Sequence, residues 1–206
     1  MSTLVLAISA VLLATSLTAQ EQKKVWSFDL DPAGALPKGF TGEVGEWKVV
    51  ADTTAPSRPN ALAQVAKNDG ETYNVVLLSD TTFKNVDLSV NMKAVAGEED
   101  QGGGLVWRAK DAQNYYIARY NPLEDNYRVY KVTKGWRKQF QSAALKLTPG
   151  WHTLRVTMKD DHIECFLDSK KYLDVKDSTF TEAGRIGLWS KADAQSHFDE
   201  LTVAEK

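Results

Sequence analysis

Apolar and polar side chains alternate with a period of two along most of the chain after residue 24. Successive side chains of a β-strand point to opposite faces, so this alternation predicts strands with one buried and one solvated face. The predicted strands are short and rich in β-branched and aromatic residues. They cover residues 25–30, 46–51, 61–66, 73–78, 87–95, 104–109, 115–120, 127–132, 151–158, 162–168, 185–190 and 198–203.

Turn-forming sequences separate these strands, and they are rich in Gly, Pro, Asn and Asp. Examples are "DPAG", "APSRPN", "KNDGE", "AGEEDQGGG", "KDAQN", "TKG", "TPG", "KDD" and "DSKK". A dozen or more strands at this spacing predict an all-β antiparallel sandwich. There is no internal repeat or linker, so we expect one domain over residues 25–206.

Trp189 and Trp107 lie on two of the predicted strands, and strand alternation predicts whether each side chain points into the core or away from it. Ile186 and Leu188 share one face of their strand, while Gly187 and Trp189 share the other. If the aliphatic pair faces the core, Trp189 faces out beside a glycine and can stack on the flat apolar face of a sugar ring. The alternative is that loops cover Trp189 and bury it.

The glycine run Gly102–Gly104 leads into the second of these strands. Leu105 and Trp107 are predicted to point inward, and Val106 and Arg108 to point the opposite way. Glycines at this position permit a close backbone approach or a bulge, or simply a flexible start to the strand. No Gly-Lys-Ser/Thr and no helix come after the run, so a phosphate-binding loop is excluded.

The N-terminus has the pattern of an export signal. "TLVLAISAVLLATSLTA" is apolar and uncharged, and "QEQKK" comes abruptly after it. We predict a signal peptide over residues 1–19 and a periplasmic or extracellular mature protein without membrane insertion. Cleavage after Ser16 is one alternative, and a retained N-terminal anchor helix is another.

Composition narrows the class of protein further. The chain is 43% hydrophobic and 25% charged, which is enough apolar residue for a sizeable core. The net charge is −2 and there is no basic block, so neither nucleic acid nor an anionic membrane is an expected partner, and we expect a monomer. Cys165 is the single cysteine, which excludes an intrachain disulfide; its alternating context predicts a core position.

Familiar catalytic motifs are absent from the sequence. The three histidines show no metal-ligand spacing, there is no Gly-x-Ser-x-Gly sequence, and no βαβ pattern precedes a glycine-rich turn. These absences argue against a zinc hydrolase, a nucleophilic-serine hydrolase and a dinucleotide-binding protein.

Carboxylates offer a different chemistry, because glycoside cleavage usually uses two of them. Glu124 is the predicted catalytic residue. Its neighbour Asp125 would point to the other side and is better suited to capping a turn, so a second carboxylate must come from another loop. Asp100 and Asp193 are the candidate partners, and Asp111 also lies near the polar loop.

The stretch "RYNPLEDN", residues 119–126, concentrates hydrogen-bonding groups in one hairpin turn. Arg119 and Asn121 share a face, and Pro122 stiffens the turn. Arg108 lies across the preceding hairpin, so two guanidinium groups can approach each other. Their partner is either a ligand rich in hydroxyls or negative charge, or Glu124 through an internal ion pair. The predicted sugar site comprises Arg108, Arg119, Asn121, Glu124, Asn126, Trp189 and Lys191.

The order of these motifs resembles the concanavalin-A-like sandwich proteins grouped as the 3-keto-disaccharide hydrolase domain. The similar features are "G-x-V-x-R", "D-x-x-N-Y-Y" and the closing "G-x-I-G-L-W … F-D-x-L-x-V". Arg108 matches the arginine of the family, whereas "DQGGG" stands where many members have Asn-Ser-Gly. The Glu-x-Asp-x-x-Glu strand of family 16 glucanases is absent.

The resemblance implies a jelly roll of two curved antiparallel sheets with a carbohydrate ligand on the concave face. We therefore expect an exported domain that binds, and in one version hydrolyses, a glycoside such as a 3-keto-disaccharide. A non-catalytic carbohydrate-binding module and an envelope interaction module are the alternatives. Related sandwiches hold a structural calcium, for which Asp199 and Asp29 would be ligands. Calcium needs six to eight oxygens, so we predict no cofactor.

Overall fold

The computed structural model describes residues 23–206, and the predicted signal peptide lies outside the described residues. Fifteen β-strands make up the regular structure of this part. The strands are β1 (Lys24–Trp26), β2 (Phe40–Val44), β3 (Trp47–Ala51), β4 (Asn60–Gln64), β5 (Tyr73–Leu78), β6 (Val86–Ala96), β7 (Gly103–Asp111), β8 (Asn114–Asn121), β9 (Asn126–Thr133), β10 (Trp136–Ala144), β11 (Trp151–Lys159), β12 (His162–Leu167), β13 (Lys170–Lys176), β14 (Arg185–Lys191) and β15 (Gln195–Glu205). Across residues 23–206 no helix has the length and hydropathy to cross a bilayer.

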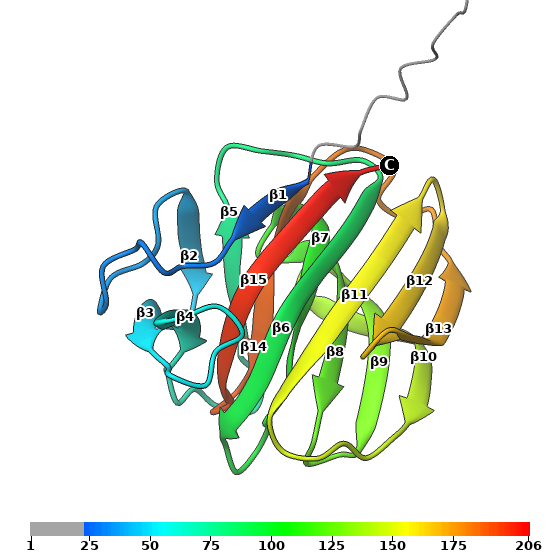
Figure 1. The fold of residues 1–206 in the computed structure, drawn as a ribbon. Coiled ribbons are helices and arrows are strands. Elements are labelled where there is room, and N and C mark those ends of the chain that lie inside the picture. Colours follow the sequence, from blue (N-terminus) through cyan, green and yellow to red (C-terminus); the bar gives the residue numbers. More distant parts are fainter. Residues whose placement is uncertain (1–22) are drawn as a thin grey trace, which may run out of the picture.

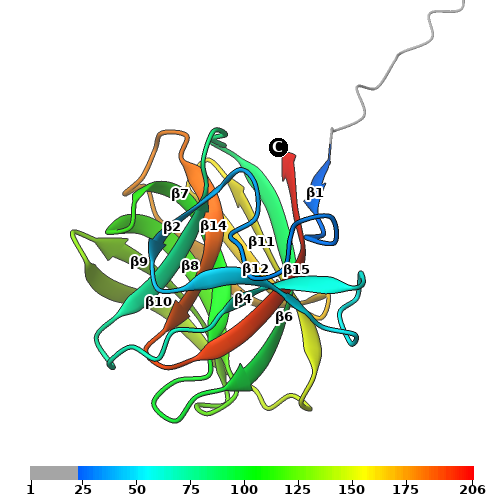
Figure 2. The same cartoon turned by 90° about the vertical axis from the view of Figure 1, so that its left-hand side faces the viewer.

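The strands form two antiparallel sheets. Sheet A has the order β13-β12-β11-β6-β15-β4-β3, with β1 added to β15, and sheet B has the order β10-β9-β8-β7-β14-β5-β2. In Figure 1, β15, β6 and β11 cross the front and β7, β8 and β9 lie behind them. Figure 2 places β9 and β10 on the left and β1, β15 and β6 on the right. The prediction of a sandwich of two antiparallel sheets is confirmed.

The hydrophobic core lies between the two sheets. In β6 the residues Val86, Leu88, Val90 and Met92 are buried, and the residues between them are not. Sheet B contributes inward side chains from β7, β8, β9 and β14 to the same core. Burial of alternate residues on facing sheets is the packing of a β-sandwich. The predicted core position of Cys165 is confirmed.

Sheet B is buried on its second face as well. Its outer face carries a separate apolar cluster that includes Val106, Tyr130 and Trp189. The Arg137 guanidinium of β10 lies 5.3 Å from the ring centroid of Tyr73 on β5, although four strands separate these two. Neighbouring strands lie about 4.8 Å apart, so in a flat sheet these strands would be about 24 Å apart. The contact therefore requires sheet B to curve, and this outer face is concave.

Three strands have no counterpart among the predicted ones, namely β2, β10 and β13. All three carry exposed residues at many positions, so they lack the regular apolar alternation that marks the others. All three are also edge strands, where one side of the backbone has no partner in the sheet.

Candidate functional site on the concave face

Polar and aromatic side chains meet on the concave face of sheet B. We call them the concave cluster, and its members are Arg119, Asn121, Glu124, Asn126, Tyr130, Arg137 and Trp189. The register explains the meeting: Arg119 of β8 pairs with Gly104 of β7, and Gly104 pairs with Trp189 of β14. Asp100 and Lys191 adjoin the cluster, since the charges of Arg119 and Lys191 both act on the Asp100 carboxyl.

The "RYNPLEDN" stretch forms the β8–β9 hairpin, as predicted. Asn121 pairs with Asn126 across it, and the Asn121 Oδ1 accepts a hydrogen bond from the Leu123 N–H at 2.9 Å. Asp125 takes a positive φ of 47°, a conformation that Asp tolerates in turns. Asp125 is therefore a turn residue, and its carboxylate lies 3.9 Å from the Lys146 Nζ.

Arg119 is completely buried in this hairpin. Its Nη2 donates to Glu124 Oε2 at 2.9 Å and to the Tyr130 hydroxyl at 3.4 Å, and its Nη1 donates to Asn126 Oδ1 at 3.2 Å. All of these acceptors are side chains. The internal ion pair between Arg119 and Glu124, one of the two alternatives in the sequence, is present.

A glycine makes room for this arginine. A Cβ on Gly104 would lie 2.2 Å from the Ala118 carbonyl oxygen and 2.9 Å from the Arg119 Cα. Side chains cannot approach backbone that closely, so β7 and β8 can pack in this way only with glycine at 104. The predicted close backbone approach at the glycine run is confirmed at this position.

Glu124 is an ionised carboxylate held by hydrogen bonds from the protein's own side chains. Its Oε2 accepts hydrogen bonds from Arg119, Asn126 and Arg128, each at 2.9 Å. Partial burial raises the pKa of the Glu124 carboxyl, but the hydrogen bonds from Asn126 and Arg119 outweigh this effect and lower it to about 2. Glu124 is therefore ionised at neutral pH, and it cannot supply a proton as a general acid.

The pKa of the Asp100 carboxyl is shifted in the opposite direction, upward. It is 1% exposed, and its Oδ1 accepts the Gly102 N–H at 2.6 Å. Burial raises the pKa of the Asp100 carboxyl, and the charges of Arg119 and Lys191 offset only part of that rise. The pKa values of Asp100 and Glu124 are thus shifted in opposite directions. Asp100, one of the two candidate partners from another loop, lies within electrostatic range of Arg119.

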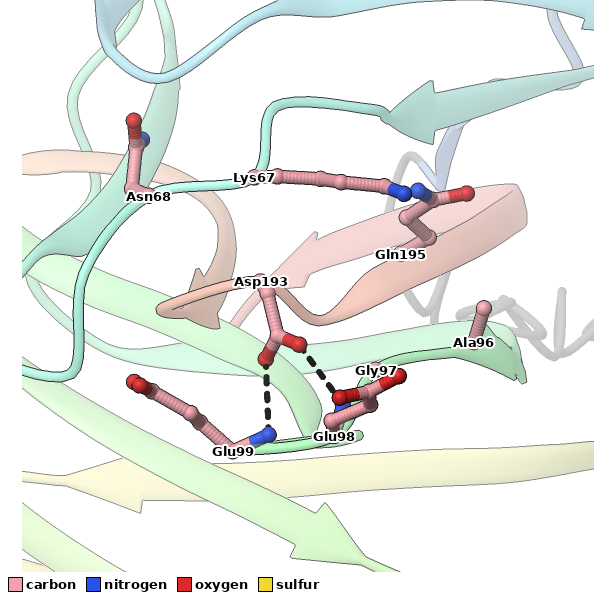
Figure 3. Close-up of a pocket in the computed structure, with 8 residues that line it drawn as sticks. All are labelled: Lys67, Asn68, Ala96, Gly97, Glu98, Glu99, Asp193 and Gln195. Carbon is pink, nitrogen blue, oxygen red and sulfur yellow. Dashed lines mark hydrogen bonds between the residues drawn. The ribbon is translucent and has the colours of Figure 1, made fainter.

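The loop that carries Asp100 is shaped by Asp193. The Asp193 carboxylate accepts the N–H groups of Glu98 at 2.6 Å, and of Glu99 and Asp100 at 3.1 Å each. Figure 3 shows two of these bonds at the floor of a hollow of about 390 Å³, with Lys67 and Gln195 across it. Both Asp193 oxygens are used on the backbone, so Asp193 positions the loop instead of acting as the second carboxylate.

Trp189 faces away from the main core, as its parity predicts, but its ring is fully buried. The Arg137 guanidinium covers it, with its Cζ 5.8 Å from the Trp189 ring, 4.5 Å from the Tyr130 ring and 5.3 Å from the Tyr73 ring. The indole N–H donates to the Tyr115 hydroxyl at 3.1 Å. Trp189 is thus no open platform in this structure, because an arginine already occupies its ring face.

Three buried N–H donors of the concave cluster have no hydrogen-bond acceptor among the described residues. They are Arg119 Nε, Asn121 Nδ2 and Arg137 Nη1. Buried polar groups in proteins are almost always hydrogen-bonded, and each exception requires an explanation. Three exceptions on one sheet face are consistent with a site that a ligand completes.

Comparison with known proteins identifies the family. The model of the 3-keto-alpha-glucoside-1,2-lyase-like domain matches residues 33–204. The chain belongs to this family. The family resemblance in the sequence motifs is therefore confirmed, and the concave cluster lies within the matched residues.

Several relatives share the sequence or the fold. A levanase of Bacillus subtilis (strain 168) is 26% identical over 192 residues, which are 91% of this chain and 25% of the levanase. The chain thus spans about a quarter of that relative. Two solved structures share the fold: the carbohydrate binding module CBM66 from Bacillus subtilis (21% identity, TM-score 0.69, 81% of this chain and 96% of that chain) and a Bacillus licheniformis β-glucanase (12% identity, TM-score 0.58, 92% and 99%).

Arg108, the arginine that matches the family motif, lies apart from the concave cluster. Its Nε donates to the Lys84 carbonyl, its Nη1 to the Phe180 carbonyl, and its Nη2 to the Asp160 carbonyl, at 2.6–2.7 Å. The Asn85 Oδ1 accepts a further bond. Arg108 has a φ of 47° and lies where the register of β7 against β8 shifts. This irregularity turns its side chain away from the face of sheet B that carries Arg119. Among residues 23–206 no contact joins the two guanidinium groups, and Arg108 anchors loops.

Three other aspartates considered from the sequence have local roles. Asp111 accepts the Gln113 N–H and the Asn114 side-chain amide, which closes the β7–β8 turn. Both Asp199 oxygens accept hydrogen bonds, from the Ser57 N–H and hydroxyl and from the Glu200 N–H. Asp29 accepts the Asn60 N–H. The chain's own donors thus occupy both Asp199 oxygens and one oxygen of Asp29.

Arg137, Tyr130, Tyr73 and Tyr115 belong to the site but are not among the residues predicted from the sequence. Tyr130 and Tyr115 share strand parity with other concave residues, so a signal for them exists. Arg137 lies on the unpredicted strand β10, and its distance along the chain from Tyr73 gives no reason to join them.

Proposed function

We propose that this protein is a carbohydrate-recognition domain that binds a glycoside at the concave cluster. The observation that carries the proposal is the set of three buried N–H donors without an acceptor, beside the rings of Tyr130 and Trp189. The family assignment and the levanase and carbohydrate-binding-module relatives support it. Neither relative defines the sugar for this chain.

The energetics favour a bound ligand that supplies oxygen atoms. A buried donor left unpaired costs about 1–3 kcal/mol, and a sugar oxygen would relieve that cost. The aromatic rings offer apolar faces on which the C–H face of a pyranose or furanose packs. Access to the Trp189 ring requires Arg137 to move, because its guanidinium lies over that ring. Within residues 23–206 the contacts that hold the Arg137 guanidinium are cation–π contacts, so these oppose the movement.

A screen of the purified chain against neutral and acidic oligosaccharides and 3-keto glycosides tests the proposal. Binding is scored by thermal shift, and cleavage by product release. We expect R119A to weaken saccharide binding by about 1–3 kcal/mol, because Arg119 holds one of the vacant donors. R155A is the matched control, since Arg155 pairs with Asp87 on sheet A. Equal loss of stability and binding in R119A, or an unchanged glycan profile, would favour the alternative of an interaction module braced by this hairpin.

Cleavage of the bound glycoside is a second candidate, carried by the opposite pKa tendencies of Asp100 and Glu124. In this version the glycosidic C–O bond breaks as Asp100 donates a proton to the leaving-group oxygen, and a water molecule bonds to the anomeric carbon and releases a proton to solvent. Glu124 remains an anion that orders Arg119, which differs from the catalytic role predicted for it. D100N keeps an oxygen for the Gly102 N–H but has no acidic proton. We expect D100N to abolish product release and to bind saccharide as the parent does. Undiminished turnover would exclude Asp100 as the acid.

Export completes the proposal. A protein that binds extracellular glycosides must meet them outside the cytoplasm, and the predicted signal over residues 1–19 supports a periplasmic or extracellular location. Fractionation of cells, with mass spectrometry of the mature N-terminus, tests both the location and the cleavage site.

A further inference from the structure

The buried vacant groups of the concave cluster are all donors. Arg119 Nε, Asn121 Nδ2 and Arg137 Nη1 are N–H groups, and among the described residues no buried side-chain acceptor of this cluster lacks a partner. A sugar hydroxyl that accepts from one of them also brings a hydrogen that needs an acceptor of its own. A carboxylate or sulfate accepts only, so it matches a set of donors without leaving a new polar group unpaired.

The charges of the cluster favour the same class of ligand. Arg119 and Arg128 share one oxygen of one carboxylate, Glu124. Arg137 has no acidic partner among the described residues, and only aromatic rings lie against its charge. Asp100 is the second carboxyl group within electrostatic range of Arg119. The guanidinium charges on this face therefore exceed the carboxylates available to balance them.

One aromatic ring connects the two arginines that carry vacant donors. The Cζ atoms of Arg119 and Arg137 lie 5.9 Å and 4.5 Å from the centroid of the Tyr130 ring. Tyr130 itself is buried on the concave face. A planar anion near this ring would reach guanidinium groups of two different strands, and Arg binds such groups through paired N–H bonds.

We infer that the glycoside bound at the concave cluster carries an anionic group, a carboxylate or a sulfate, which Arg119 and Arg137 bind. This inference rests on the proposed carbohydrate-binding function and adds the substrate class. Arg137 is the specificity residue. In this structure it lies over Trp189, and in the complex it turns its donors to the anion while a sugar ring takes its place on the aromatic face.

Paired saccharides test the inference with the purified chain. Galacturonate oligosaccharides are compared with their methyl esters, which keep the sugar and remove the charge. Sulfated galactan oligosaccharides are compared with their desulfated forms, and these two arms distinguish carboxylate from sulfate. Isothermal titration calorimetry measures the dissociation constants at fixed salt. We expect one acidic form to bind at least tenfold more tightly than its neutral partner.

Variants then assign that preference. R137Q should reduce it to about twofold or less, and R137K, which keeps the charge without the planar fork, should retain a part of it. K138Q is the matched control, because Lys138 is the next residue of β10, is exposed and points to the opposite side. Thermal unfolding confirms that each variant is folded.

The outcomes separate the inference from the proposed function. Equal binding of acidic and neutral forms by the parent protein overturns the inference but leaves carbohydrate binding intact. An equal loss of preference in K138Q and R137Q also overturns it, because diffuse charge would then explain the preference. Binding of no saccharide in the whole panel overturns the proposed function itself, and the inference with it.

Discussion

Two arginines of sheet B, Arg108 and Arg119, are both buried, yet they use their donors differently. Arg108 donates from every guanidinium nitrogen, and three of its acceptors are main-chain carbonyls of separate loops. Arg119 donates to side chains only, and its Nε has no partner among residues 23–206. Buried guanidinium groups are costly unless paired, so a complete set of bonds indicates a structural role and an incomplete set indicates a ligand.

This difference reverses what the motif suggests. Arg108 matches the arginine of the family pattern and is predicted from the sequence to bind sugar, while the structure assigns it to anchoring Lys84, Asp160 and Phe180. A residue that occurs regularly in a family motif can be there because the fold needs it. Arg137, by contrast, covers the rings of the candidate site from β10, whose sequence carries none of the quoted motifs.

The largest expected effect comes from removing Arg108. R108A removes the donor of three main-chain carbonyls, of which the Phe180 carbonyl is buried, and truncates a buried side chain. Lost packing and unpaired polar groups together lead us to expect a loss of roughly 3 kcal/mol in the free energy of unfolding. Urea denaturation at pH 7 measures it. R155A, which removes a partly exposed arginine from an ion pair with Asp87, should cost about 1 kcal/mol or less. A loss in R108A no larger than in R155A would contradict the anchoring role.

A smaller effect on stability, with a larger effect on binding, is expected at Gly104. The methyl group of G104A would overlap the Ala118 carbonyl and crowd Arg119, which forces β7 and β8 apart. Overpacking of this kind costs about 1–3 kcal/mol, and the shift of Arg119 should reduce saccharide binding further. G42A is the control, because a Cβ at Gly42 meets nothing within 4 Å. Normal binding by a folded G104A would show that the concave cluster is less rigid than its packing implies.

The sequence predicts the fold better than the site, for a physical reason. Alternation reports which face of a strand is buried, and it correctly assigns Leu105, Trp107, Ile186 and Leu188 to the core. Alternation says nothing about which strands become neighbours. Arg137 reaches the rings of Trp189 and Tyr73 only because sheet B curves, and that curvature depends on the whole sheet.

The carboxylates show the same limit at closer range. The sequence indicates that Glu124 needs a partner from another loop, and the charges of Arg119 and Glu124 both act on the Asp100 carboxyl. Which carboxylate is protonated depends on burial and on donors that are distant in sequence. Asp193, an equally reasonable candidate from the sequence, instead accepts three N–H groups from residues 98–100.

The smallest expected effect concerns the ion pair between Arg119 and Glu124. Its contribution to stability depends on pH, which distinguishes Arg119 from Arg108. The pKa of Glu124 falls from an ordinary value of 4.5 to about 2 in the folded protein, because its hydrogen bonds to Asn126 and Arg119 outweigh the effect of burial. A lowered pKa contributes stability that is complete above about pH 4.5 and is lost as the pH falls towards 2. The Glu124 side chain is 41% exposed, so solvent screening limits this contribution to about 1 kcal/mol or less.

E124Q should therefore be less stable than the parent protein at pH 7 by about that amount, and the difference should shrink steadily between pH 4.5 and pH 2. Denaturation of both proteins at pH 7, 4.5 and 3 measures it, and other titrating groups cancel in the comparison. R108A provides the contrast, because the hydrogen-bond acceptors of Arg108 are carbonyl and amide oxygens that do not titrate, so its deficit should change by a smaller fraction over this range. If the stability difference between E124Q and the parent were the same at pH 3 as at pH 7, the charge of the Arg119–Glu124 pair would contribute nothing to stability. The electrostatic argument for a binding site around Arg119 would then fail.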